Sequence, residues 1–258
     1  MSGPFDLSGK RALVSGASRG MGRAIALGLA RAGAEVAVAA RNPETLEPVA
    51  EEIRALGREA LVQSLDVSRP EEIPAAVKRV EEHLGPLDIL FNVAGTNPRR
   101  PIAEIAEAEY DQIMDVNIKG AYFFSREVGK GLITRQRGKV INIASVTSAI
   151  GLAKVTAYAC SKGALAQLTR SLAVEWGPHN VQVNAIAPGF ILTDFNRKLW
   201  ENPAMLDWAV DGTPAGRLGQ PEDVVGAAIF LASPASDFIS GQVLFVDGGY
   251  MAGRPWPL

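Results

Sequence analysis

The pair Tyr158 and Lys162 is the strongest candidate for acid–base chemistry in this chain. The two side chains are four residues apart and therefore lie one turn from each other on the same face of a helix. A tyrosine with its ordinary pKa of about 10 is a poor base at neutral pH, but a nearby ammonium group favours the phenolate. Ser145, thirteen residues earlier, adds a hydroxyl that could bind a reactant oxygen. Because this Tyr-Lys spacing is common and usually structural, its meaning depends on the rest of the chain.

A glycine-rich turn offers a second candidate site. Gly16, Gly20 and Gly22 follow an apolar run directly and precede a helical pattern. Glycines in a strand-to-helix turn let the backbone approach a pyrophosphate, whose charge the free N–H groups and the helix dipole stabilise. A tight structural turn is the alternative for an isolated glycine cluster, but the position after the first strand favours a dinucleotide.

The end of the second predicted strand indicates which dinucleotide is bound. An acid at this place would accept the ribose hydroxyls of NAD, whereas here Ala40 is followed by Arg41, and Arg19 in the glycine turn can reach the same place. Guanidinium groups pair bidentately with phosphate, so the sequence predicts a preference for NADP(H), with NAD(H) possible. Alternatively, Arg41 stacks on the adenine or is merely exposed.

Short apolar runs alternate with longer helical patterns along the whole chain. This rhythm predicts an α/β protein with a doubly wound Rossmann fold, in which helices cover both faces of a seven-stranded parallel sheet. The expected strands are 11–15, 35–40, 60–65, 87–92, 139–145, 181–186 and 243–246. The expected helices are 21–32, 43–56, 70–84, 109–135, 156–176 and 221–231, with Pro43 and Pro70 at first helical positions. We expect one domain over 1–258, with a substrate lid at about 189–218.

Composition and charge exclude several classes of protein. With 47% hydrophobic and 21% charged residues, the chain is typical of a globular protein rather than a disordered one. The net charge of −2 gives no broad basic field for nucleic acid or anionic lipid, so small molecules are the expected partners. The chain lacks a spanning apolar run, its start lacks a signal-peptide pattern, and Cys160 stands alone, so we expect a cytoplasmic protein.

Together with the segment Asn92-Val-Ala-Gly95, these residues closely resemble the short-chain dehydrogenase/reductase family. The resemblance extends from residue 7 to about residue 250. The family's Asn-Ser-Tyr-Lys tetrad is occupied by Asn117, Ser145, Tyr158 and Lys162.

The resemblance implies an NAD(P)-dependent oxidoreductase that transfers a hydride between a nicotinamide and a secondary alcohol or ketone. Since hydride transfer to a ketone leaves an alkoxide, Tyr158 would supply a proton and Ser145 would hold the oxygen. By resemblance, Lys162 also binds the nicotinamide ribose and Asn117 holds a water that relays protons.

The family's cofactor positions also carry over to this chain. Asp66 and Val67 would contact adenine, although Asp66 equally suits a turn-capping role, and Ile191 and Thr193 would hold the carboxamide. The full expected cofactor-binding set is Gly16, Ser18, Arg19, Gly20, Met21, Gly22, Arg41, Asp66, Val67, Asn92, Ala94, Gly95, Tyr158, Lys162, Pro188, Gly189, Ile191 and Thr193.

The segments that would line a substrate pocket are cationic. Arg99, Arg100 or Arg197 could pair with a carboxylate, unless these side chains are simply exposed on loops. The pocket and C-terminal segments are similar to family members that act on gluconate and deoxygluconate, so we expect a sugar-acid substrate such as gluconate or 5-ketogluconate. The alternatives are a 3-oxoacyl-[acyl-carrier-protein] reductase and, from another class, a non-catalytic cofactor-binding regulator, which predicts a damaged tetrad.

The resemblance implies a homotetramer, with helices 109–135 and 156–176 in one interface and the region 242–250 in a second. No metal site is expected, because His83 and His179 lie near helix ends without close partners. Cys160 faces away from Tyr158 and Lys162 on the helix, and we expect it to pack in the interior.

Overall fold

The computed structural model describes residues 3–253, and the two ends of the expected domain, 1–2 and 254–258, lie outside the described residues. Its centre is a seven-stranded sheet with the order β3-β2-β1-β4-β5-β6-β7, in which every neighbouring pair is parallel. The strands are β1 (Arg11–Ser15), β2 (Glu35–Ala40), β3 (Ala60–Ser64), β4 (Ile89–Asn92), β5 (Gly138–Ile143), β6 (Val181–Pro188) and β7 (Val243–Val246). The predicted doubly wound sheet is confirmed.

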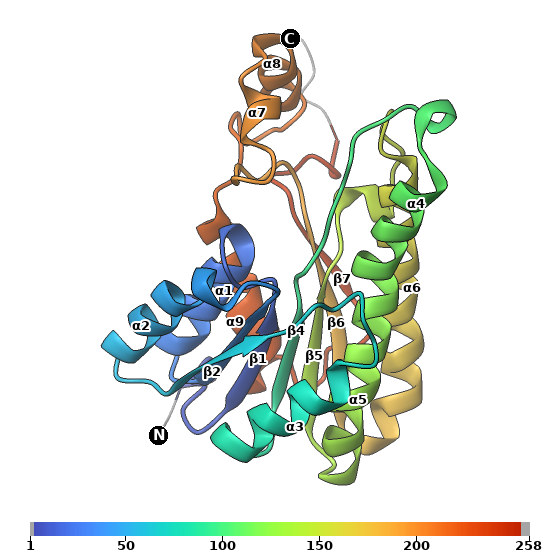
Figure 1. The fold of residues 1–258 in the computed structure, drawn as a ribbon. Coiled ribbons are helices and arrows are strands. Elements are labelled where there is room, and N and C mark those ends of the chain that lie inside the picture. Colours follow the sequence, from blue (N-terminus) through green and yellow to red (C-terminus); the bar gives the residue numbers. More distant parts are fainter. Residues whose placement is uncertain (1–2, 254–258) are drawn as a thin grey trace.

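Helices cover both faces of this sheet (Figure 1). One apolar core joins the sheet to α1 (Gly20–Arg31), α2 (Glu47–Ala55) and α9 (Val225–Ala232). The other core joins it to α3 (Ile73–Leu84), α5 (Gly120–Thr134) and α6 (Thr156–Trp176). Burial on both faces explains the nearly continuous apolar strands; all eight residues of β6 are buried.

Four predicted helices differ from the structure by more than one residue, among them 221–231, which consists of a 3₁₀ turn, Pro221–Val224, followed by α9. The region 43–56 consists of a 3₁₀ turn, Pro43–Thr45, followed by α2, and α3 begins at Ile73 rather than at Pro70. The predicted helix 109–135 consists of α4 (Glu107–Met114), a π-helical turn (Asp115–Lys119) and α5. Such π turns occur mostly inside α-helices and often at functional sites.

The segment 189–218, which we call the lid segment, lies beyond the carboxyl ends of the strands (Figure 1). Its two short helices are α7 (Arg197–Trp200) and α8 (Pro203–Asp211). At its base, the amide of Leu192 donates to the carbonyl of Gly219 (2.8 Å), and the amide of Gly219 donates to the carbonyl of Phe190 (2.9 Å). These two bonds close the segment into a loop over the edge where the predicted site residues lie.

Phe190 lies at the centre of an aromatic cluster that holds the lid helices to the C-terminal turn. Its ring makes edge contacts with Trp200, Trp208 and Tyr250, at centroid distances of 5.8, 5.4 and 4.9 Å. Aromatic pairs at such distances contribute beyond their buried area. The lid segment is therefore a packed element of the fold. Among the described residues, no helix has the length and apolar character needed to cross a membrane.

Candidate active site

The glycine turn packs directly against the loop that follows β4. Gly16 has a φ of +66°, and a Cβ added there would lie 2.8 Å from the amide nitrogen of Ala94. Ser15 links the same two segments, because its hydroxyl accepts the amide of Val93 (3.0 Å) and donates to the carbonyl of Phe91 (3.2 Å). Glycine is therefore needed at position 16 both for its backbone conformation and for this close contact.

A cavity of about 270 Å³ separates the start of α1 from the lid segment. Its lining includes Gly20, Thr193 and Arg197. Thr193 borders the turn closely: a Cβ added to Gly20 would lie 3.3 Å from its methyl group. An open space beside the first turn of a twelve-residue helix fits an anionic group, since the free amides and the dipole of the helix point there. The turn therefore fits the pyrophosphate of a dinucleotide.

Two cations lie near this turn without a partner in the described part of the chain. The side chains of Arg19 and Arg41 are exposed, and their guanidinium groups make no hydrogen bond or ion pair with a described residue. By contrast, Arg23 in the same region pairs with Glu52. The neutral Ala40 ends β2 beside Arg41. This end of the sheet can therefore hold an additional phosphate.

Asp66 adopts the turn-capping role that was one of its two expected roles. Its carboxylate accepts the amide and the hydroxyl of Ser68, at 3.0 and 2.7 Å. Val67 beside it is buried, and its carbonyl lies 2.6 Å from the position of a Cβ added to Gly120. The turn after β3 is thus held firmly against α5.

The side chain of Asn92 points into the core. Its amide donates to the Ser125 hydroxyl and to Asn142 Oδ1, both at 2.9 Å, and Asn142 donates in turn to the Thr169 hydroxyl at 2.9 Å. This network of buried, hydrogen-bonded side chains joins β4, β5, α5 and α6 below the site. Sequence analysis missed Asn142, Ser125 and Thr169, because nothing local distinguishes a buried polar residue that has partners from an exposed one.

Ser145, Tyr158 and Lys162 meet at the carboxyl end of β5. Ser145 follows the strand and starts a 3₁₀ turn, where its hydroxyl accepts the amide of Thr147 (3.1 Å), and its side chain lies close enough to the Tyr158 hydroxyl to lower the pKa of that group. Lys162 Nζ donates to the carbonyl of Ile143 (2.6 Å) and lies 5.6 Å from the centroid of the Tyr158 ring. The structure thus brings together the three side chains that the sequence pattern selected.

The pKa values of this cluster differ from the sequence expectation. Burial raises the pKa of Tyr158, while the Ser145 side chain and the charge of Arg99 lower it in part. Burial lowers the pKa of Lys162 from 10.5 to about 8. The sequence pattern predicts that the Lys162 ammonium favours the phenolate, whereas in this structure withdrawal from water disfavours the charged form of both groups and acts in the opposite direction.

Asn117 lies in the π turn, and both hydrogens of its side-chain amide are used outside that turn. Its Nδ2 donates to the carbonyl of Thr96 and to the hydroxyl of Ser161, both at 3.0 Å, and its Oδ1 accepts the amide of Thr96 (2.8 Å). The position of a Cβ added to Gly95 lies 3.5 Å from Asn117 Oδ1 and 3.7 Å from Lys162 Nζ. Asn117 therefore ties the loop after β4 to α6 beside the lysine, and its side chain has no free hydrogen for a water.

The loop after β6 is held by a residue that sequence analysis missed. Asn196 Oδ1 accepts the amide and the hydroxyl of Thr193, at 2.9 and 3.2 Å, and its Nδ2 donates to the carbonyl of Ile191 (2.7 Å). Gly189 at the start of the loop packs on Asp247, which lies 2.8 Å from the position of an added Cβ. An asparagine three residues after a threonine in a loop was the only local sign of this turn.

The three candidate arginines have different surroundings. Arg100 pairs with Glu109 (2.7 Å), and Arg197 pairs with Asp194 (3.2 Å). Arg99 instead lies over the ring of Phe195 in the lid segment, 5.7 Å from its centroid. Its charge also acts on Tyr158 across the site, and partial burial lowers its pKa. Of these three cations, Arg99 is the one without a carboxylate partner among the described residues.

The residues that sequence analysis left outside the site stay outside it. His83 lies 3.5 Å from Glu59, and the His179 ring hydrogen-bonds to Gln136 (2.9 Å). The described residues contain no cluster of three or more metal-ligating side chains. Cys160 is exposed, so the prediction that it packs in the interior is wrong. It occupies the outer face of α6, which the sheet does not cover.

Comparisons with known proteins agree with this geometry. A family model described as enoyl-(acyl carrier protein) reductase matches residues 16–251. Gluconate 5-dehydrogenase from Gluconobacter oxydans is 43% identical over 95% of this chain and 96% of that protein. The 5-keto-D-gluconate 5-reductase of Escherichia coli K12 is 40% identical over 97% and 99% of the two chains. A solved gluconate 5-dehydrogenase from Burkholderia cenocepacia, in complex with NADP and tartrate, superposes with a TM-score of 0.94 at 40% identity, over 97% of this chain and 98% of that one.

Proposed function

This chain belongs to the short-chain dehydrogenase/reductase family, and we propose that it reversibly reduces the keto group of a small sugar acid with NADPH. One observation carries the choice of substrate: Arg99, a cation without a carboxylate partner among the described residues, lies near enough to Tyr158 for its charge to lower the pKa of that hydroxyl. Bidentate pairing of a guanidinium with a carboxylate would orient such an acid. Names of relatives support the same class, as does the tartrate bound to the Burkholderia cenocepacia protein, itself a hydroxy acid.

Within this proposal, Ser145, Tyr158 and Lys162 act on the substrate carbonyl as a unit. The Ser145 hydroxyl binds the carbonyl oxygen, and the Tyr158 hydroxyl donates its proton to that oxygen as it becomes an alcohol. The raised pKa of Tyr158 keeps it in the acid form needed for reduction. Lys162, whose pKa of about 8 lies near neutrality, can return a proton to the tyrosine. Asn117 would hold the loop after β4 beside Lys162, because it hydrogen-bonds to Thr96 in that loop and to Ser161 next to the lysine.

The proposed cofactor site is the crevice between the glycine turn and the lid segment. Bound NADPH would supply the hydride. The backbone of 16–22 would hold the pyrophosphate, Asp66 and Val67 the adenine side, and Ile191 and Thr193 the nicotinamide side. Arg19 and Arg41 would bind the 2′-phosphate, because both are exposed and free of partners among the described residues. NADP bound to a relative of this chain supports this preference.

Substrate and cofactor panels test the proposal together. We expect faster NADPH oxidation with 5-keto-D-gluconate than with acetoacetyl thioesters, and higher kcat/KM with NADPH than with NADH. Efficient reduction of the thioester, with ketogluconate untouched, would favour an oxoacyl-carrier-protein reductase. No turnover with any ketone would favour the non-catalytic regulator, against which the assembled Ser145, Tyr158 and Lys162 argue.

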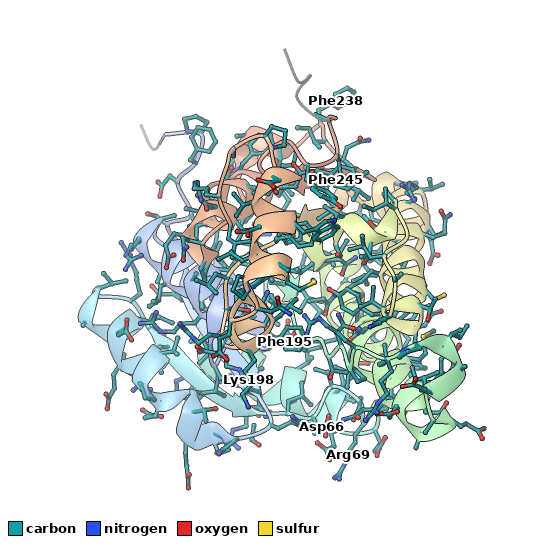
Figure 2. The ribbon with its side chains drawn as sticks, turned by 90° about the horizontal axis from the view of Figure 1, so that it is seen from above. Asp66, Arg69, Phe195, Lys198, Phe238 and Phe245 are labelled. Atoms are coloured by element: carbon teal, nitrogen blue, oxygen red, sulfur yellow. The ribbon has the colours of Figure 1, made fainter. Side chains whose placement is uncertain are left out.

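We also propose that the chain works as one domain, as a cytoplasmic homotetramer drawing on the cell's NADP(H). Apolar side chains on two surfaces support this assembly. Val174 on α6 and Tyr122 on α5 are 81% and 50% exposed, and Phe238 before β7 projects fully from the surface (Figure 2). Light scattering should give a mass four times that of the 27.4 kDa chain; a monomer at micromolar concentration would contradict the proposal.

A further inference from the structure

The contact between Arg99 and Phe195 joins the two loops that border the site. Arg99 belongs to the loop after β4, whereas Phe195 belongs to the lid segment. Seen from above, Phe195 lies near the middle of the molecule, between the side of α1 and α2 and the side of α4 to α6 (Figure 2). The Arg99 side chain is exposed and makes no hydrogen bond or ion pair with a described residue, so the ring of Phe195 is the contact that restrains it.

An aromatic partner differs from an acidic one in a way that matters for binding. Asp194 and Glu109 each accept from one guanidinium nitrogen, of Arg197 and Arg100 respectively, and offset the charge of these arginines. A guanidinium over an aromatic ring keeps its net charge, and the ring has no carboxylate oxygen to accept its N–H groups. The structure therefore holds Arg99 without consuming the donors that a substrate carboxylate needs.

The turn that carries Phe195 is itself held in place. The three hydrogen bonds of Asn196 fix the backbone of 191–196, and Thr193 within this turn lies against Gly20 of the glycine turn. Phe195 is thus attached to the part of the lid that borders the proposed cofactor site. Its ring has a defined position from which to restrain Arg99.

We propose that Phe195 is a positioning residue that holds Arg99 for the carboxylate of the substrate and so makes the site selective for acids. This inference rests on the proposed function. It assigns the selectivity to a pair of residues on two loops rather than to Arg99 alone. Loss of the ring frees the guanidinium and raises KM for an acidic ketone, while proton donation by Tyr158, and hence kcat, stays nearly unchanged.

The test compares Phe195→Leu, Phe195→Tyr and Arg99→Ala in the full-length protein. Substrates are 5-keto-D-gluconate and fructose, which is a ketone without a carboxylate. We expect Phe195→Leu to lower kcat/KM for ketogluconate by about fivefold through KM, as a cation–π contact between exposed side chains implies. Phe195→Tyr, which keeps the ring, should retain wild-type values. Phe5→Leu, at an exposed phenylalanine outside the site, is the matched control.

Two further measurements separate positioning from a general disturbance of the lid. The Kd of NADPH should be the same in Phe195→Leu and wild type, and the Kd of D-gluconate for the NADPH-loaded protein, a pair that cannot react, should rise about fivefold. In Arg99→Ala, adding Phe195→Leu should have no further effect, because the ring acts only through the arginine.

Several results would overturn the inference. Three results would each show that Phe195 acts in another way. They are an equal loss of kcat/KM for ketogluconate and fructose in Phe195→Leu, weakened binding in Phe195→Tyr, and a double variant with Arg99→Ala that loses more than Arg99→Ala alone. If wild type neither reduces ketogluconate nor binds gluconate, the proposed function fails, and the inference fails with it. If wild type does both and Phe195→Leu matches it, the inference alone fails.

Discussion

Replacement of Lys162 by methionine should remove activity without loss of stability at neutral pH. Only 3% of Lys162 is exposed, and burial lowers its pKa from 10.5 to about 8. At about 1.4 kcal/mol per pKa unit, keeping this ammonium buried costs the fold roughly 3 kcal/mol below pH 8. Methionine removes that cost and fills a similar volume. It also leaves the Ile143 carbonyl without its donor, which costs about 1–3 kcal/mol.

The two effects nearly cancel at pH 7.5, so we expect the variant to be as stable as wild type or up to about 2 kcal/mol more stable. The pH dependence is the sharper test. The pKa of Lys162 is lower in the folded than in the unfolded protein, so the unfolded wild type binds more protons between about pH 8 and 10.5. The free energy of unfolding of wild type therefore increases as the pH rises through this range. The Lys162→Met variant lacks this gain.

Urea unfolding of both proteins without cofactor, at pH 7.5 and at pH 9.5, measures the difference. From pH 7.5 to 9.5, wild type should gain about 2 kcal/mol relative to Lys162→Met, which corresponds to about 4–8 °C in Tm for a chain of this size. Lys78→Met, at an exposed lysine, is the control and should show no such difference. A pH-independent difference between wild type and Lys162→Met would refute the argument that burial controls this lysine.

Three other predictions follow from the site and the core. Tyr158→Phe should fold and bind NADPH normally but lose about 10²–10⁴-fold in kcat, measured by NADPH oxidation; near-wild-type turnover would exclude Tyr158 as the proton donor. Arg41→Ala should weaken NADP binding by about 10- to 100-fold and leave NAD binding unchanged in calorimetric titrations; equal losses would mean that Arg41 stacks on adenine. Asn142→Ala should lower the free energy of unfolding by about 2–4 kcal/mol, since it leaves Asn92 without a buried acceptor; an unchanged urea midpoint would contradict this.

The sheet and the local motifs could be predicted from the sequence, because their causes are local. The strands β1, β2 and β7 have the predicted bounds, since apolar runs bounded by polar residues and glycines mark strands buried on both faces. Tyr158 and Lys162 share a helix face through their spacing alone, and Gly16 needs its positive φ at a turn. The π turn at 115–119 could not be predicted, because it interrupts a continuous helical pattern in the sequence. In the structure it occurs where the Asn117 side chain contacts Thr96 and Ser161, which are distant in the sequence.

Tertiary structure alone decided the electrostatics of the site. The pKa values of Tyr158 and Lys162 depend on how far distant segments exclude water from them, which spacing along the chain does not reveal. The same holds for the three arginines, because the sequence does not distinguish which of them could bind a carboxylate. In the folded chain Arg100 and Arg197 pair with acids, whereas Arg99 lies over an aromatic ring. Residue types and short spacings thus determined which groups can react, whereas contacts between remote segments determined their charge, their partners and their freedom to bind a substrate.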